Sequence, residues 1–180
     1  MNKSDEEMIA DIRNWLEKAV IGLNLCPFAK AVHVKEQIRY AVSNAQNEEE
    51  LLADLLHELQ MLYDANAADI ETTIMIHPYV LQDFLDYNDF LEIADAAVSE
   101  LALDGEIQVA SFHPDYQFAG TRHEDVENYS NRAPYPSLHL LRESSVEKAV
   151  AAFPDAGKIY EKNIETLKSL GSEGWKKLWL

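Results

Sequence analysis

The sequence predicts a single α/β domain with a central sheet of about four strands, βαβ crossovers and covering helices. Two observations favour this class. Apolar residues recur at helical intervals in several segments, and four short segments have strand patterns. Strand-like residues 72–76 and 107–112 flank one helical segment, so they are expected to run parallel as a βαβ unit. A ferredoxin-like α+β sandwich, built from four strands and two main helices, is the alternative.

Chain length and composition bound the class of protein. The chain has 180 residues, enough for one domain with an ordinary hydrophobic core, and we treat 1–180 as that domain. The single Cys and the acidic N-terminal segment, which lacks the apolar stretch of a signal peptide, predict a cytoplasmic protein without disulfides. No apolar run approaches the roughly 18 residues that a membrane helix needs, so we expect no membrane partner.

The charge is strongly negative and unevenly distributed. A formal net charge of −17 would repel nucleic acid, so none is expected as a partner. Arginine is suited to fork-shaped hydrogen bonding with carboxylate or phosphate, but it also forms structural pairs with Asp and Glu. Both roles stay open for the Lys and Arg side chains between Lys35 and Lys148, which are all arginines: Arg39, Arg122, Arg132 and Arg142.

The N-terminal third begins with two helical segments. Residues 4–20 are predicted to form an amphipathic helix, with Ser4 and Glu7 at capping-box spacing and Gly22 as its stop. Pro27 suits the first turn of a further helix, which would place Cys26 at the N-cap. There the helix dipole would lower the pKa of the thiol and favour a nucleophilic thiolate. A small buried apolar role is the alternative for Cys26.

The middle of the chain alternates strand and helix. A strand is predicted within 34–43, followed by a helix that opens with Asn47 and Glu50 at capping-box spacing. Residues 72–76 are β-branched and apolar, which predicts a central strand. A helical region follows, with Asn88 as the cap of its main part and Gly105 as its end.

Two strands end in the same dipeptide. Residues 72–76 lead into His77-Pro78, and residues 107–112 lead into His113-Pro114. The carboxyl ends of parallel strands share one edge of a sheet, which is the usual ligand edge of open α/β sheets. His77 and His113 are therefore candidate neighbours, with either one as the base for Cys26. The alternative is that both are strand-end histidines bonded to the backbone.

Residues 113–136 form a long segment between strand patterns. Loops of this length in a compact domain are usually functional or disordered, and the aromatic and amide side chains here favour an ordered loop. One hypothesis is that the loop and the following strand hold a small anionic ligand. The residues proposed for it are Arg122, Arg132, Arg142, Asn128 and Tyr116.

A second hypothesis for this region is a metal site. Its ligands would be His77, His113 and His139, with Asp115 as a further candidate. Their spacing matches no standard zinc signature, so the sequence assigns no cofactor.

The C-terminal third predicts a short strand at 138–141 and two helices. Ser144 and Glu147 have capping-box spacing, and Asp155 precedes a second periodic segment that ends at Gly171. The tail GSEGWKKLWL carries two tryptophans, which favours a packing latch or a subunit contact over a catalytic role. A homo-oligomer is compatible with such a tail.

Four stretches together resemble a known bacterial family of about this length, a domain of unknown function. They read GLNLCPFAKAV, TTIMIHPYVLQDFLDYNDFL, QVASFHPDYQFAG and NRAPYPSLHLLRE. The resemblance runs from Trp15 to the last helix. It implies a stand-alone soluble bacterial protein and carries no activity, cofactor or catalytic residue.

The function favoured by the residues is therefore that of an enzyme or binding protein for a small anionic molecule. Cys26, His77 and His113 are the candidate catalytic residues, and the arginines are the candidate ligand-binding residues. The alternative is a non-catalytic protein-interaction module that uses the aromatic loop and the Trp-containing tail. A shared pocket for these side chains would favour an enzyme over the interaction module.

Overall fold

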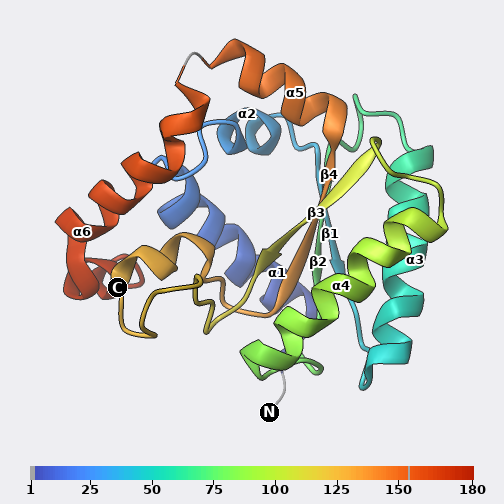
Figure 1. The fold of residues 1–180 in the computed structure, drawn as a ribbon, viewed down its shortest axis with the longest axis horizontal. Coiled ribbons are helices and arrows are strands. Elements are labelled where there is room, and N and C mark those ends of the chain that lie inside the picture. Colours follow the sequence, from blue (N-terminus) through green and yellow to red (C-terminus); the bar gives the residue numbers. More distant parts are fainter. Residues whose placement is uncertain (1–2, 154) are drawn as a thin grey trace.

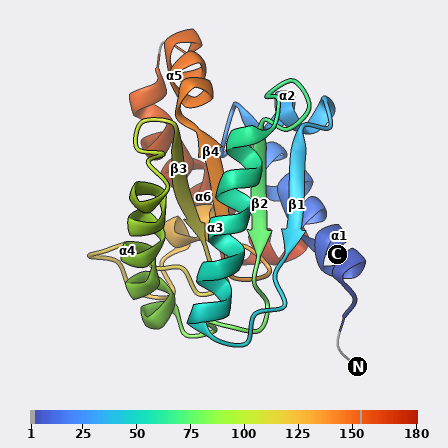
Figure 2. The ribbon, with the colours of Figure 1, turned by 90° about the vertical axis from the view of Figure 1, so that its right-hand side faces the viewer.

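The computed structural model describes residues 3–153 and 155–180, and it contains a four-stranded mixed sheet between two layers of helices (Figures 1 and 2). The order across the sheet is β1-β2-β4-β3. Within the described residues no helix is both long and apolar enough to cross a membrane. The strands are β1 (Ile38–Val42), β2 (Thr72–Ile76), β3 (Ile107–Phe112) and β4 (Ser137–Arg142).

The helices fall before, between and after these strands. Helix α1 (Asp5–Trp15) continues into a π-helical segment, η1 (Leu16–Ile21), and is followed by α2 (Ala29–Val34). Helices α3 (Glu48–Asp64) and α4 (Phe84–Glu100) connect the first three strands. The 3-10 helix η2 (Val126–Asn131) lies in the long loop. Helix α5 (Glu143–Ala152), the 3-10 turn η3 (Ala156–Lys158) and helix α6 (Ile159–Lys177) complete the chain.

The topology confirms the predicted α/β class and its crossovers. Strands β1 and β2 pair in parallel, and β2 and β3 both run antiparallel to β4, so β1, β2 and β3 share one direction. Helices α3 and α4 are the crossovers between them. Strand β4 lies between β2 and β3, which makes a split βαβ unit. This run of two helical crossovers replaces the ferredoxin-like alternative.

Each face of the sheet has its own core because side chains alternate along a strand. Met75, Leu138 and Leu140 are buried against α3 and α4, which lie side by side on one face (Figure 2). Ile74 and Ile76 are buried on the other face, against α1 and η1. The site candidates divide between these two faces.

The predicted caps are confirmed for α1 and α3 and are wrong for α4 and α5, since α5 begins at Glu143, after Arg142, without a side-chain cap. Ser4 forms both halves of the capping box with Glu7, and Asn47 Oδ1 accepts the Glu50 N–H at 2.9 Å. The predicted cap at Asn88 is wrong, because α4 begins earlier, at Asp83, whose carboxylate accepts the N–H groups of Leu85 and Asp86. An Asp N-cap satisfies amides that otherwise lack partners.

The structure separates Arg142 from the other loop arginines. Arg142 pairs with Ile107 at the start of β3, the end of the sheet opposite His113. Its Nη2 lies 2.7–3.0 Å from three carbonyl oxygens that follow or end α3, those of Leu62, Ala65 and Ile70. The predicted ligand role of Arg142 is therefore corrected to one of holding the C-terminal end of α3, where carbonyls lack helical partners.

Replacing Arg142 with Met should lower the free energy of unfolding by about 3 kcal/mol, because hydrogen bonds from a charged donor are lost. Urea unfolding monitored by circular dichroism measures this. The control is Arg122→Gln, at an exposed arginine paired on the surface with Asp125, which should change stability little. Equal stability of Arg142→Met and wild type would contradict the holding role.

Candidate functional site

The two predicted histidines lie at the same sheet edge and pack against one tyrosine. His77 and His113 are both fully buried. The centroid of the Tyr87 ring lies 5.7 Å from that of His77 and 5.0 Å from that of His113. The expected shared edge is present even though β4 separates the two strands, because β2 and β3 still point the same way.

Backbone hydrogen bonds hold both imidazoles in place. His77 Nδ1 lies 3.2 Å from the Val80 carbonyl oxygen, and His113 Nε2 lies 3.1 Å from that of Leu81. Burial lowers the pKa of His77 to about 4 and also lowers the pKa of His113. The pair is therefore neutral, and its contacts match the backbone-bonded alternative for strand-end histidines.

Tyr87 makes this cluster a brace between α4 and the sheet. Its hydroxyl donates to the Ser137 carbonyl at 2.7 Å and accepts the Phe112 N–H at 3.0 Å. Burial raises the pKa of the Tyr87 phenol. The hydroxyl thus joins the end of β3 to the start of β4 and fixes where the long loop leaves and rejoins the sheet.

The prediction for Cys26 is wrong in its helix position. Helix α2 begins at Ala29 with Phe28 as its N-cap, so Cys26 lies in the preceding turn. Burial raises the pKa of its thiol, and this outweighs the lowering by the backbone N–H groups of Phe28 and Ala29. Cys26 packs on the α1 face of the sheet, whereas both histidines pack against Tyr87 on the α4 face. The proposed nucleophile and base are not brought together.

The three histidines proposed as metal ligands do not converge. His139 pairs with Ile74 and so lies on the α1 face of the sheet, with its Nε2 2.6 Å from Thr72 Oγ1. The carboxylate of Asp115 faces His123, at 3.4 Å. Among residues 3–153 and 155–180, no group of three His, Cys, Asp or Glu side chains could hold a metal ion.

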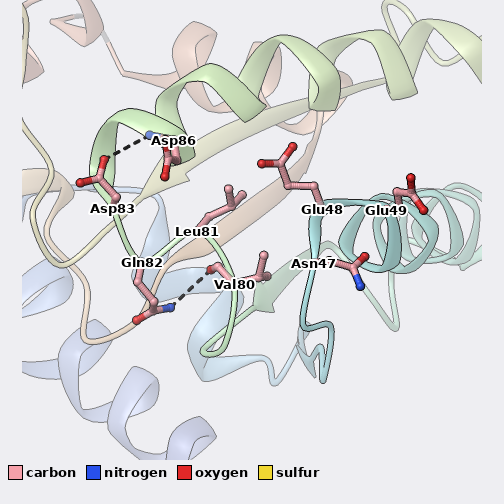
Figure 3. Close-up of a pocket in the computed structure, with 8 residues that line it drawn as sticks. All are labelled: Asn47, Glu48, Glu49, Val80, Leu81, Gln82, Asp83 and Asp86. Atoms are coloured by element: carbon pink, nitrogen blue, oxygen red, sulfur yellow. Dashed lines mark hydrogen bonds between the residues drawn. The ribbon is translucent and has the colours of Figure 1, made fainter.

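A cavity of about 650 Å³ lies between the start of α3 and the loop before α4 (Figure 3). The described residues that line it include four acidic side chains and none that is cationic. Asn47 and Asp83 already cap α3 and α4. The carbonyl oxygens of Val80 and Leu81 are hydrogen-bonded to the two buried histidines. This cavity does not suit an anion. Its lining residues are Asn47, Glu48, Glu49, Val80, Leu81, Gln82, Asp83 and Asp86.

The long loop is ordered around one buried amide. Asn128 is fully buried; its Oδ1 accepts from the Phe118 N–H and the Thr121 hydroxyl, each at 2.9 Å. Its Nδ2 donates to the Arg122 carbonyl at 2.8 Å. Asn128 therefore braces the loop, which corrects its predicted ligand role. The side chain of Arg122 is exposed and paired with Asp125, so it also stands apart from the cavity described next.

A second cavity, of about 350 Å³, lies between this loop, the end of α1 and the last part of the chain. All three tryptophans of the protein line it. Its two charged lining residues are both cations, and no carboxylate is among the described residues that line it. The lining residues are Trp15, Pro114, Tyr129, Arg132, Ala133, Pro134, Ser172, Trp175, Lys176 and Trp179.

Arg132 enters this cavity from the loop. Its Nε donates to the Tyr116 carbonyl at 3.1 Å, its Nη2 donates to the His123 carbonyl at 2.5 Å, and its guanidinium carbon lies 5.0 Å from the centroid of the Tyr129 ring. Burial lowers the pKa of Arg132. Within the described part of the chain no carboxylate lies within 4.0 Å of it, so the alternative of a buried pair with an acidic residue of the loop does not apply.

The C-terminal segment supplies four of the lining residues. Helix α6 is interrupted at Gly171, with φ 67° and ψ 173°, and Ser172, Trp175, Lys176 and Trp179 all follow this kink. The Trp175 ring lies 5.1 Å from that of Tyr129, so the segment packs on the loop as a latch. Lys176 and Trp15 are not among the site residues predicted from the sequence. The alternation of basic and aromatic residues in the segment WKKLW could have indicated Lys176 as a binding residue. No local pattern in the sequence indicates such a role for Trp15.

Comparison with protein families assigns the chain. The model of the family described as "Protein of unknown function (DUF1415)" matches residues 7–177. The chain belongs to this family. Comparison with curated proteins gave no match, and neither did comparison with solved structures. The family description assigns no activity.

The kink provides a test of the latch. Gly171 has a backbone conformation that is open almost only to glycine, so Gly171→Ala should cost about 1–3 kcal/mol in docking the segment after it. We expect a red shift of tryptophan emission as Trp175 and Trp179 gain contact with water. The control is Gly157→Ala, where an added Cβ meets no heavy atom within 4 Å. Emission unchanged in Gly171→Ala would show that the segment docks without the kink.

The buried histidines make stability depend on pH. The pKa of His77 is about 4 in the folded protein and about 6.5 in an unfolded chain, so the unfolded state takes up the proton first as the pH falls. His77 should therefore reduce the free energy of unfolding by roughly 3 kcal/mol between pH ~6.5 and pH ~4. His77→Asn keeps a donor for Val80 and should flatten this dependence in urea titrations. A slope identical to that of wild type would contradict the buried neutral imidazole.

Proposed function

We propose that this DUF1415 protein binds a small anionic molecule in the cavity between the 113–136 loop and the C-terminal segment. One observation carries the proposal. Arg132 and Lys176 both line a cavity whose described lining residues include no carboxylate, although the net charge of the chain is −17. A cavity of about 350 Å³ lies within the size range of small-molecule sites. A cationic concavity in a negative protein is a local attractor for an anion.

Arg132 supports this proposal because no carboxylate of the described residues lies within 4.0 Å of its guanidinium group. Arg39 is paired with the carboxylate of Glu58 at 2.8 Å, and Arg122 with that of Asp125 at 3.0 Å. Arg132 instead donates two of its five N–H groups to carbonyls. Its remaining N–H groups suit the paired oxygens of a carboxylate or phosphate. These carbonyl bonds also fix the guanidinium, so little side-chain entropy would be lost on binding.

The lining favours binding over catalysis. Ser172 and Tyr129 supply the hydroxyl groups, and the described lining residues include no His, Cys, Asp or Glu that would serve as a base. Arg132 and Lys176 are both cations that hold charge without moving a proton at neutral pH. We therefore assign the cavity to recognition of the anion.

A second candidate function uses the same tail as a protein-interaction surface. Trp179 is 38% exposed and Leu180 is 97% exposed, which leaves apolar surface at the end of the chain. A pure interaction surface would gain nothing from phosphate, whereas an anion site would, so the experiment below separates the two.

Phosphate or sulfate should raise the melting temperature more than chloride does at matched ionic strength, with saturation at millimolar concentration, because only the native state holds the anion site. Arg132→Gln and Lys176→Gln should each reduce this difference. Lys177→Gln is the matched control: it removes the same charge from the neighbouring exposed lysine, which does not line the cavity.

Two results would contradict the proposal. The first is a wild type whose melting temperature responds equally to phosphate and chloride. The second is an equal loss of the phosphate effect in Lys176→Gln and Lys177→Gln, which would mean diffuse attraction to the whole tail. Lys176 makes only a surface pair with Glu173, so its variant should keep the fold even if Arg132→Gln does not.

A further inference from the structure

We infer that the anion is the charged group of a planar aromatic molecule, whose ring packs against the tryptophans while its negative group reaches Arg132 and Lys176. This inference rests on the proposed function. It adds the chemical class of the ligand, which a site for a simple inorganic anion would not require.

The aromatic lining supports a flat, apolar part of the ligand. Four of the residues that line the cavity are aromatic, and three of their rings form a connected series. The Tyr129 and Trp175 centroids are 5.1 Å apart with the rings tilted by 43°, and those of Trp175 and Trp179 are 5.5 Å apart with the rings nearly perpendicular. A site for inorganic phosphate alone would gain nothing from such a wall, whereas aromatic rings stack on it favourably.

The cations border this wall. The Arg132 guanidinium lies 5.0 Å from the Tyr129 centroid, and Lys176 directly follows Trp175 in the chain. Ring and charge are therefore recognised within one cavity, by neighbouring side chains. A volume of about 350 Å³ is at the lower end of the range for ligand sites, which favours a mononucleotide-sized molecule or smaller over a polymer.

Trp15 supplies a separate observation. It is only 4% exposed, it lines the cavity, and its Nε1–H has no acceptor among the described residues. A buried indole N–H without a partner is unfavourable, so most such groups are hydrogen-bonded. Because this nitrogen is itself buried, it adds no hydrogen bond to a ligand, and Trp15 contributes only apolar lining to the cavity.

Two classes of molecule share this chemistry: nucleoside monophosphates and aromatic carboxylates. Polynucleotides are disfavoured by the net charge of −17. The probes are therefore matched sets. Adenosine 5′-monophosphate is compared with ribose 5-phosphate, which lacks the ring, and with adenosine, which lacks the anion. Benzoate is compared with cyclohexanecarboxylate, which has the same charge on a saturated ring.

The protein carries its own reporter, because all three of its tryptophans line the cavity. Binding is measured by tryptophan emission and by calorimetry on the full chain. Stacking of one base contributes about 1–3 kcal/mol, so at least one aromatic anion should bind about tenfold or more tightly than its ring-free or saturated counterpart. Trp179→Leu should reduce that ratio. Tyr160→Leu, at an exposed aromatic residue outside the cavity lining, is the control.

The outcomes separate this inference from the function it rests on. If ribose 5-phosphate matches adenosine 5′-monophosphate and cyclohexanecarboxylate matches benzoate, while phosphate still stabilises the fold, the aromatic inference is overturned and the anion site stands. If adenosine binds as well as its monophosphate, recognition of the anion by the cavity is overturned. A preference confined to one of the two matched sets supports the inference and identifies the phosphate or the carboxylate as the charged group.

Discussion

The candidate site depends on the buried amide of Asn128. A 24-residue connection between β3 and β4 would lose much conformational entropy on ordering, and Asn128 offsets part of this by satisfying Phe118, Thr121 and Arg122 from one side chain. The 3-10 helix that contains Asn128 also contains Tyr129, on which Arg132 and Trp175 pack. The loop side of the cavity is thus positioned by hydrogen bonds to one buried side chain.

The cations of the protein divide by what neutralises them. Arg39 has a carboxylate and Arg142 has three carbonyls, and both stabilise the packing of α3 on the sheet. Arg132 has carbonyls and an aromatic face, yet it borders a cavity. A partly buried cation without a carboxylate is less stable than a paired one, and an incoming anion would relieve that cost. This difference in partners distinguishes Arg132, which borders the cavity, from the structural arginines Arg39 and Arg142.

Local sequence signals predicted the elements, and long-range contacts decided the site. Periodicity placed the strands, because side chains alternate between the two faces of a strand, and capping placed the starts of α1 and α3, because the cap partners lie three residues apart. The position of β4 between β2 and β3 and the partners of Arg142, up to 80 residues away, leave no such local signal. Pro27 pointed to a helix start near Cys26, but α2 begins at Ala29, after Cys26. The His77–His113 edge was predictable from topology; their bonds to the 80–81 carbonyls were not.

The anion site can be tested in a crystal of the protein soaked in selenate, because the selenium scatters anomalously and marks an oxyanion site. We predict an anomalous peak in the cavity, with selenate oxygens within hydrogen-bond distance of the Arg132 guanidinium and the Lys176 ammonium group. Selenate bound at other surfaces, with this cavity empty in a crystal where no neighbouring molecule blocks it, would contradict the central claim that the cavity between the loop and the C-terminal segment is an anion site.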